Sequence, residues 1–140
     1  TVTGMQYKAA EGFTLAFQNG WDKEAYTNGK IWQVATLRPG KYRLEVTYAY
    51  TMVVSDVGNF ISALMAKGNS ESDIPNVADI EQLNGVCAIY DKAGTNDDSG
   101  VLVTPSFEVT ETTDVVIGFL TSLAKGNSYF KVTELKLILE

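Results

Sequence analysis

The sequence predicts an all-β protein, an antiparallel β-sandwich of about eight strands. Apolar and aromatic residues alternate with polar ones in several short segments, as they do in a strand with one buried face. Turn-forming residues separate these segments at short intervals. Only one short stretch has helical spacing. Together these patterns are typical of a sandwich or barrel built from many short strands.

Residues 29–50 show the pattern most clearly and are expected to form a central hairpin. The turn at 38–40 is predicted from Pro39 and Gly40, because Pro presets φ at one corner of a turn and Gly accepts a positive φ at the next. The second strand alternates cleanly and has an apolar face made of Tyr42, Leu44, Val46, Tyr48 and Tyr50. We expect Trp32, in the first strand, to be buried or covered.

The other apolar segments predict the remaining strands. They cover residues 13–17, 60–66, 86–90, 101–109, 115–120 and 129–139, and residues 1–12 hold one short strand or a linker. Pro105 predicts an edge, a bulge or a break within its segment. A change of parity after Val132 predicts a bulge near Thr133-Glu134. Apolar residues at every third position of 77–83 suggest one or two helical turns.

Length and composition predict a single domain. The chain has 140 residues, of which 45% are hydrophobic and 20% charged, the mix of an ordinary globular protein. It begins at Thr1, without an initiator Met or a signal peptide. We therefore interpret residues 1–140 as one β-sandwich domain from a longer protein.

The charge and hydropathy patterns exclude two classes of partner. Lys and Arg number 11 against 17 Asp and Glu, which gives a net charge of −6. Nucleic acids and anionic membrane surfaces are bound through basic patches, so neither is an expected partner. No apolar run approaches the roughly 20 residues of a membrane helix, so direct membrane insertion by this domain is not expected.

The side chains present argue against an enzyme. The chain contains no His, which excludes Ser-His and Cys-His catalysis. Cys87 is the single Cys, so an internal disulfide and a Cys-based zinc site are excluded. Its apolar neighbours predict a buried, structural thiol. A carboxylate pair could hydrolyse a glycoside, but we expect the loop carboxylates to face solvent: Asp22, Glu24, Glu71, Asp73, Asp97 and Asp98.

Residues 91–100 combine turn formers with hard oxygen donors, among them Asp91, Asp97 and Asp98. Their spacing differs from that of an EF-hand loop, and the Glu that closes such a loop is missing. We expect a solvated hairpin loop and no metal site here.

Residues 28–44 resemble a strand-turn-strand pattern of galactose-binding-like jelly-roll domains. The positions that carry the resemblance are Gln33, Leu37, Pro39, Gly40 and Tyr42. The closing residues 115–139 are similar too, with an apolar strand, a Gly-Asn loop and a final alternating strand. The chain looks most like C-terminal domains of glycan-utilisation lipoproteins on the surface of gut bacteria. The resemblance covers about residues 13–139.

This resemblance implies a non-catalytic carbohydrate-binding module in a cell-surface or secreted bacterial protein. An outer-membrane anchor would then lie in another part of the parent protein. No cofactor is expected. The structural calcium ion of some members is disfavoured because Glu134 and Lys136 flank Leu135, where an Asp usually precedes the final apolar pair.

Two loops carry the residue types that recognise sugars. An aromatic ring stacks on the apolar face of a sugar, while amides and carboxylates bond its hydroxyl groups. The loop at 19–29 offers Trp21, Asp22, Tyr26 and Asn28. In carbohydrate-binding members of the fold that the chain resembles, the last loop often supplies an Asn, which implies a role for Asn127 beside Tyr129. Polysaccharides or oligosaccharides are the expected ligands.

The same loop residues have an ordinary structural interpretation. Trp21 can cover one end of the sandwich, and Asn-Gly pairs are common turn formers. The alternative function is a docking domain without a ligand of its own, which contacts neighbouring domains of the parent protein or another protein. An exposed apolar patch on the surface would favour this alternative.

Overall fold

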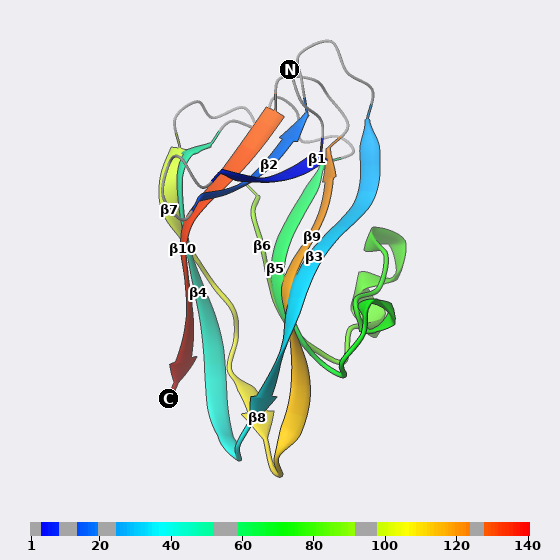
Figure 1. Cartoon of the computed structure of the whole chain (residues 1–140), viewed down its shortest axis with the longest axis vertical. Helices are drawn as coiled ribbons and strands as arrows, with labels where there is room; N and C mark the ends of the chain where they lie inside the picture. The colour runs from blue at the N-terminus through cyan, green and yellow to red at the C-terminus, as the bar shows by residue number, and fades with distance from the viewer. Residues whose placement is uncertain (1–3, 9–13, 20–24, 52–58, 92–97, 124–127) are drawn as a thin grey trace.

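The protein is a two-layered antiparallel β-sandwich, which confirms the predicted fold class (Figure 1). The computed structural model describes residues 4–8, 14–19, 25–51, 59–91, 98–123 and 128–140. Sheet A has the strand order β1-β2-β10-β4-β7, with β8 also paired to β4. Sheet B has the order β3-β9-β5-β6.

The strands follow the predicted apolar segments closely. Sheet A contains β1 (Gly4–Lys8), β2 (Thr14–Asn19), β4 (Gly40–Thr51), β7 (Asp98–Val103), β8 (Phe107–Val109) and β10 (Ser128–Leu139). Sheet B contains β3 (Tyr26–Leu37), β5 (Phe60–Lys67), β6 (Gly85–Ile89) and β9 (Thr113–Leu123). Two 3₁₀ helices, η2 (Glu71–Asp73) and η3 (Val77–Gln82), lie between β5 and β6. The spacing of apolar residues at 77–83 is therefore confirmed as helical turns.

The predicted central hairpin is wrong, although both of its strands and its turn are present. β3 pairs with β9, whereas β4 pairs with β10, β7 and β8, so the turn at 38–40 crosses from one sheet to the other. Leu37 and Tyr42 are buried in the same core cluster from opposite sheets. The Tyr42 hydroxyl donates a 2.7 Å hydrogen bond to the carbonyl of Arg38 and closes the turn. Alternation identifies the buried face of a strand but not its hydrogen-bonded neighbour.

The core lies between the two inner faces. The alternating face of β4 is buried as predicted from Tyr42 to Tyr48, with Leu44 and Val46 fully covered, and the Tyr50 side chain lies outside the described part. At one end of the core, three aromatic rings, those of Tyr48, Tyr90 and Phe130, stand with neighbouring centroids 5.1 or 5.2 Å apart. Central strand β9 is buried on both faces, which explains its continuous apolar run.

A third layer covers part of the outer face of sheet B. The η2–η3 segment packs Ile74, Val77 and Ile80 against a cluster that includes Leu64 and Leu120. Cys87 touches this cluster and is half-buried, so the expectation of a buried thiol is wrong. The 3₁₀ segment leaves the Cys87 side of β6 only partly covered.

Both predicted irregularities of sheet A are confirmed. Pro105 separates β7 from β8, and the preceding Thr104 holds the break in place. The Thr104 backbone N–H donates to the Leu44 carbonyl at 3.0 Å, and its Oγ1 accepts from the Leu44 N–H at 2.9 Å. The register of β10 against β4 shifts between Val132 and Glu134, at the predicted bulge.

Candidate functional site

The strand register brings the described residues that flank the two predicted sugar-binding loops to the same end of the sandwich. Asn19 pairs with Ser128, and Tyr26 pairs with Leu123, so the described residues that flank one loop lie beside those that flank the other. Trp21, Asp22 and Asn127 themselves lie outside the described residues.

Tyr26 is fixed at the edge of the core. Its ring packs against the core cluster between the sheets, and its hydroxyl lies 3.0 Å from Thr121 Oγ1. Burial raises the pKa of Tyr26 above its ordinary value, and the hydrogen bond to Thr121 partly offsets this. These contacts give Tyr26 a structural role.

Asn28 joins three parts of the fold. It has a positive φ of 55°, a conformation that Asn adopts more readily than most residues, and it lies at an irregularity in the pairing of β3 with β9. Its backbone N–H donates to Ser122 Oγ at 2.9 Å. Its side-chain Oδ1 accepts from the Val77 N–H at 2.8 Å. The proposed contacts of Tyr26 and Asn28 with sugar remain predictions.

Tyr129 is half-buried on β10, just beyond the second loop. Lys131 Nζ lies 5.7 Å from the centroid of its ring, within the range of a cation–π contact. Since Tyr129 is close to the paired ends of the two loops, it belongs to the same end of the sandwich as Tyr26.

Trp32 is exposed, so the expectation that it would be buried or covered is wrong. It is 38% exposed on the outer face of β3, directly opposite Gly118 of β9. A Cβ at Gly118 would press on the backbone of Ile31 and Trp32. Gly118 therefore permits β3 and β9 to approach closely under the indole. A Gly inside an otherwise apolar strand was the sequence signal for this close approach.

The outer face of β3 continues from Trp32 as a narrow strip. Val34 is 43% exposed, and beyond it the Thr36 hydroxyl donates a 2.7 Å hydrogen bond to Asp114 Oδ1. On the other side of Trp32, Lys30 Nζ donates to the Ile74 carbonyl at 2.7 Å and holds the η2–η3 segment against β3. We call the residues Trp32, Val34, Thr36 and Asp114 the outer strip.

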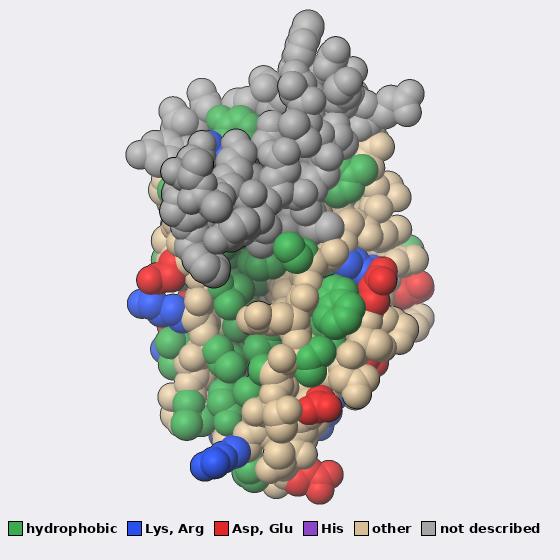
Figure 2. Space-filling model, viewed as in Figure 1, with side chains coloured by type: hydrophobic (Ala, Val, Ile, Leu, Met, Phe, Trp, Pro, Cys, Tyr) green, Lys and Arg blue, Asp and Glu red, His purple; other side chains and the backbone are tan. Residues whose placement is uncertain are grey.

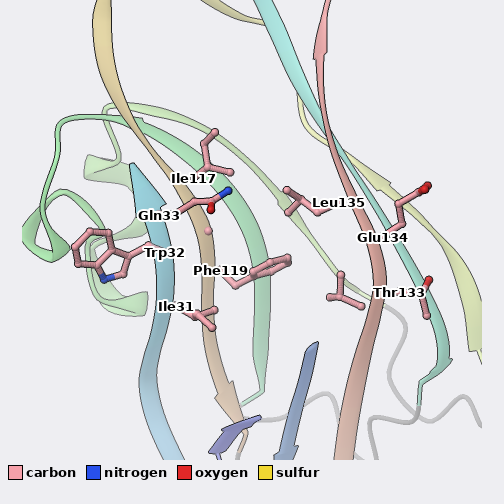
Figure 3. A pocket seen from close by; sticks show the side chains of 10 residues that line it. Ile31, Trp32, Gln33, Ile117, Phe119, Thr133, Glu134 and Leu135 are labelled. Atoms are coloured by element: carbon pink, nitrogen blue, oxygen red, sulfur yellow. The ribbon is translucent and has the colours of Figure 1, made fainter. Parts of the chain in front are cut away.

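A groove opens between the two sheets on the other side of β3. It encloses about 720 Å³ between β3 and β9 on one side and β10 on the other. Figure 3 shows Ile31, Gln33 and Phe119 facing Leu135 across it, whereas Trp32 points away on the far side of β3. Figure 2 shows the hydrophobic side chains that remain visible along this opening. We call it the lateral groove.

The groove exists because sheet A is narrower at one end. β2 pairs with β10 only from Ser128 to Val132. Past the bulge, residues 134–139 of β10 pair with β4 alone among the described strands. Leu137 and Leu139, on the inner face of this part, are 36% and 64% exposed.

Residues 2–118 match a family described as a domain of unknown function, DUF5013. The chain belongs to the DUF5013 family. No curated protein matches this DUF5013 chain. The family match contains β3 and most of β9, and therefore Trp32 and Gly118, whereas β10 lies beyond it.

The described residues of the DUF5013 domain contain neither a metal-binding cluster nor a membrane-spanning helix. Within that part of the chain, no three His, Cys, Asp or Glu side chains lie close enough together to hold a metal ion. Of the predicted solvated loop, Asp91 and Asp98 are described, and the Tyr90 hydroxyl donates a 2.8 Å hydrogen bond to Asp98 Oδ2. No helix in the described ranges is long and apolar enough to cross a membrane.

Proposed function

We propose that the DUF5013 domain is a non-catalytic carbohydrate-binding module. The observation that carries this proposal is the exposed indole of Trp32 on the outer face of sheet B. A Trp ring supplies a large apolar contact area and loses little conformational entropy when it binds, which suits the apolar face of a sugar ring. The pairing of β3 with β9 fixes the backbone from which this ring projects.

The outer strip has the length and chemistry of a site for a short stretch of glycan. Trp32 and Thr36 are four residues apart on one strand, which corresponds to about 13 Å. Val34 extends the apolar surface, and the Thr36–Asp114 pair offers a hydroxyl and a carboxylate to sugar hydroxyls. The strip therefore accepts two or three sugar units with a stacking contact at one end and polar contacts at the other.

The end of the sandwich that carries the two loops offers a second location. The described residues that flank the two loops lie at the end where Tyr129 is half-buried, and Trp21, Asp22 and Asn127 belong to these loops in the sequence. Sugar binding there would follow the resemblance to galactose-binding-like jelly-roll domains. The same resemblance supports a place on the bacterial cell surface or outside the cell, within a protein anchored in the outer membrane through another region.

Native gel electrophoresis through embedded polysaccharides tests the proposal without relying on a Trp signal. The net charge of −6 drives the protein toward the anode, and binding retards it. We expect at least one plant or host polysaccharide to retard the wild type. Trp32→Ala abolishes the retardation, whereas Trp32→Tyr, which preserves a stacking ring, retains most of it.

Two further variants make the result specific. Val103→Ala removes an exposed apolar side chain from sheet A and leaves the retardation unchanged. Trp21→Ala reports on the loop end: loss of binding in Trp21→Ala but not in Trp32→Ala places the sugar there. A broad panel that retards none of these folded proteins contradicts the carbohydrate function.

A docking domain is the second candidate function. The lateral groove favours it, because a solvent-exposed apolar opening is characteristic of surfaces that bind other proteins.

A further inference from the structure

The lower half of β10 is a sheet edge that lies beside an apolar groove. On the side away from β4, β10 pairs with β2 at residues 128–132. Among the described strands, none pairs with that side of residues 134–139. Strand edges with unpaired backbone groups are templates for the addition of another strand. With respect to the described strands, the position next to Leu137 is therefore open to a further strand of sheet A.

The backbone of this edge points toward the open position at alternate residues. The Glu140 N–H donates to the Lys41 carbonyl of β4 at 2.8 Å. In an antiparallel pair the direction of these groups alternates, so Leu135, Leu137 and Leu139 direct their N–H and C=O groups away from β4. The Leu44 backbone, opposite Leu137, agrees with this assignment because it bonds to Thr104 on the other side of β4.

The side chains around the edge define what the added strand must carry. Leu135 lines the lateral groove, and Leu137 and Leu139 continue its apolar row along β10 beyond the groove. On the outer face, Glu134 and Lys136 form an ion pair of 3.4 Å. A complementary strand would place apolar residues in the groove at every second position, with a cation opposite Glu134 and an anion opposite Lys136.

We infer that the lateral groove binds an extended, alternately apolar segment of another polypeptide, which pairs with residues 134–139 of β10 as an added strand. This interaction goes beyond glycan binding and uses the side of the groove that faces Leu135, away from the Trp32 ring. Main-chain hydrogen bonds to the Leu137 edge would supply affinity, and the groove and the two outer charges would supply selectivity.

A second copy of the chain fits this edge poorly. An antiparallel symmetric pair centred on Leu137 places Glu134 opposite Glu140, and one centred on Lys136 places two Lys side chains opposite each other. A pair centred on Leu135 brings the copy to Val132, where β2 already occupies the position. A pair centred on Ile138 spans only residues 136–140 and leaves the groove beside Leu135 unfilled. It sets Lys136 opposite Glu140, but the Glu140 carboxylate already bonds to Ser106 and Arg43. A different polypeptide that runs along the whole of residues 134–139 therefore fits this edge better.

A synthetic peptide designed on this pattern tests the inference. The sequence Val-Thr-Val-Glu-Val-Lys, blocked at both ends and labelled with fluorescein through a Gly-Ser linker, runs antiparallel to residues 139–134. Its Lys then lies opposite Glu134 and its Glu opposite Lys136. We expect saturable binding to the wild type by fluorescence anisotropy. N-methylation of the central Val, which removes a donor aimed at Leu137, weakens binding about tenfold.

Variants of the protein test both parts of the site. Leu137→Pro removes the N–H that points to the open side, a change that an edge strand tolerates, and it weakens peptide binding about tenfold. Leu139→Asp, at a position that is 64% exposed, weakens it by placing a charge in the apolar row beside the open edge. Val103→Asp, on the outer face of β7, is the matched control and binds as the wild type does. Circular dichroism and thermal unfolding establish that each variant is folded.

The outcomes separate this inference from the glycan proposal. Trp32→Ala retains peptide binding because the indole points away from Leu135, although Trp32 is among the residues that line the groove. Leu137→Pro retains glycan binding because Leu137 lies on β10, outside the outer strip. The inference is overturned if the wild type shows no saturable peptide binding, or if the N-methylated peptide binds equally well. Self-association that disappears in Leu137→Pro would overturn it too, by assigning the edge to a second copy.

Discussion

The Asn28 Oδ1 atom accepts a hydrogen bond of 2.8 Å from the backbone N–H of Val77, which lies 49 residues later in the chain. Val77 is the first residue of η3, and the first N–H groups of a helix have no partner within the helix. The η3 N-cap residue, Asn76, makes no side-chain cap hydrogen bond, so Asn28 supplies a hydrogen bond from the neighbouring strand. Together with Lys30, it fastens the η2–η3 segment to β3.

We predict that Asn28→Gly lowers the free energy of unfolding by about 1 kcal/mol, because the Val77 N–H loses its acceptor. Gly accepts the positive φ, so this variant isolates the hydrogen bond. Asn28→Ala lowers the free energy of unfolding by roughly another 1 kcal/mol, since a Cβ disfavours the left-handed conformation. Urea unfolding measures both values.

Asn28→Asp is the matched control. It preserves an oxygen acceptor and a residue that tolerates positive φ, so we expect its unfolding midpoint to remain near that of the wild type. Equal stability of the Gly and Asp variants would contradict the role assigned to the Asn28 side chain.

Local patterns in the sequence were sufficient to predict most strands, the buried face of β4 and two irregularities. Pro105 has no N–H to donate to a neighbouring strand, and the change of parity after Val132 requires one extra residue in its strand. Both irregularities can therefore be predicted from the residues themselves. The pairing of the strands could not be predicted from these local patterns. A short turn normally joins neighbours in one sheet, but here Leu37 and Tyr42 bury their side chains from opposite sheets.

The candidate sites depended on contacts that sequence patterns do not contain. Asn28 looked like a turn former or a sugar ligand because its partner, Val77, is remote in the chain. The exposure of Trp32 follows from where the η2–η3 segment stops covering sheet B. The lateral groove depends on β2 ending beside Val132, which is a property of sheet register.

We predict that Thr104→Val destabilises the domain by about 1–3 kcal/mol, although the two side chains have nearly the same shape. Thr104 is buried, and its Oγ1 is an acceptor for the Leu44 N–H at the break between β7 and β8. Val leaves this buried donor without its partner. Thr104→Ser retains the oxygen and loses only a methyl group, so it should be the more stable of the two variants.

Amide hydrogen exchange gives a local measure of the same contact. The Leu44 amide should exchange faster in Thr104→Val than in Thr104→Ser when both are compared at equal global stability. If Leu44 exchanges at the same rate in both variants, the Oγ1 contact does not protect it.

The Asp73 carboxylate should contribute stability that depends on pH. Its Oδ2 accepts hydrogen bonds from the backbone N–H groups of Ser70 and Asn69, at 3.0 and 2.9 Å. These bonds, first that of Ser70, hold the pKa of Asp73 below its ordinary value. Because the folded-state pKa is lowered, the contribution is complete above the unfolded pKa of about 3.9 and is lost as the pH falls through the folded pKa.

The comparison with Asp73→Asn isolates this contribution, since Asn retains one oxygen acceptor but carries no charge. We predict that the wild type is the more stable protein at pH 7 and that its advantage shrinks as the pH falls below about 4. Urea unfolding midpoints of both proteins across this range measure the difference. An advantage that stays constant down to the acid limit of folding would mean that the Asp73 charge is not what holds the loop between β5 and η2. The lost stability would then have to come from the shape of the side chain, which lies where a Cβ on Gly68 would otherwise fit.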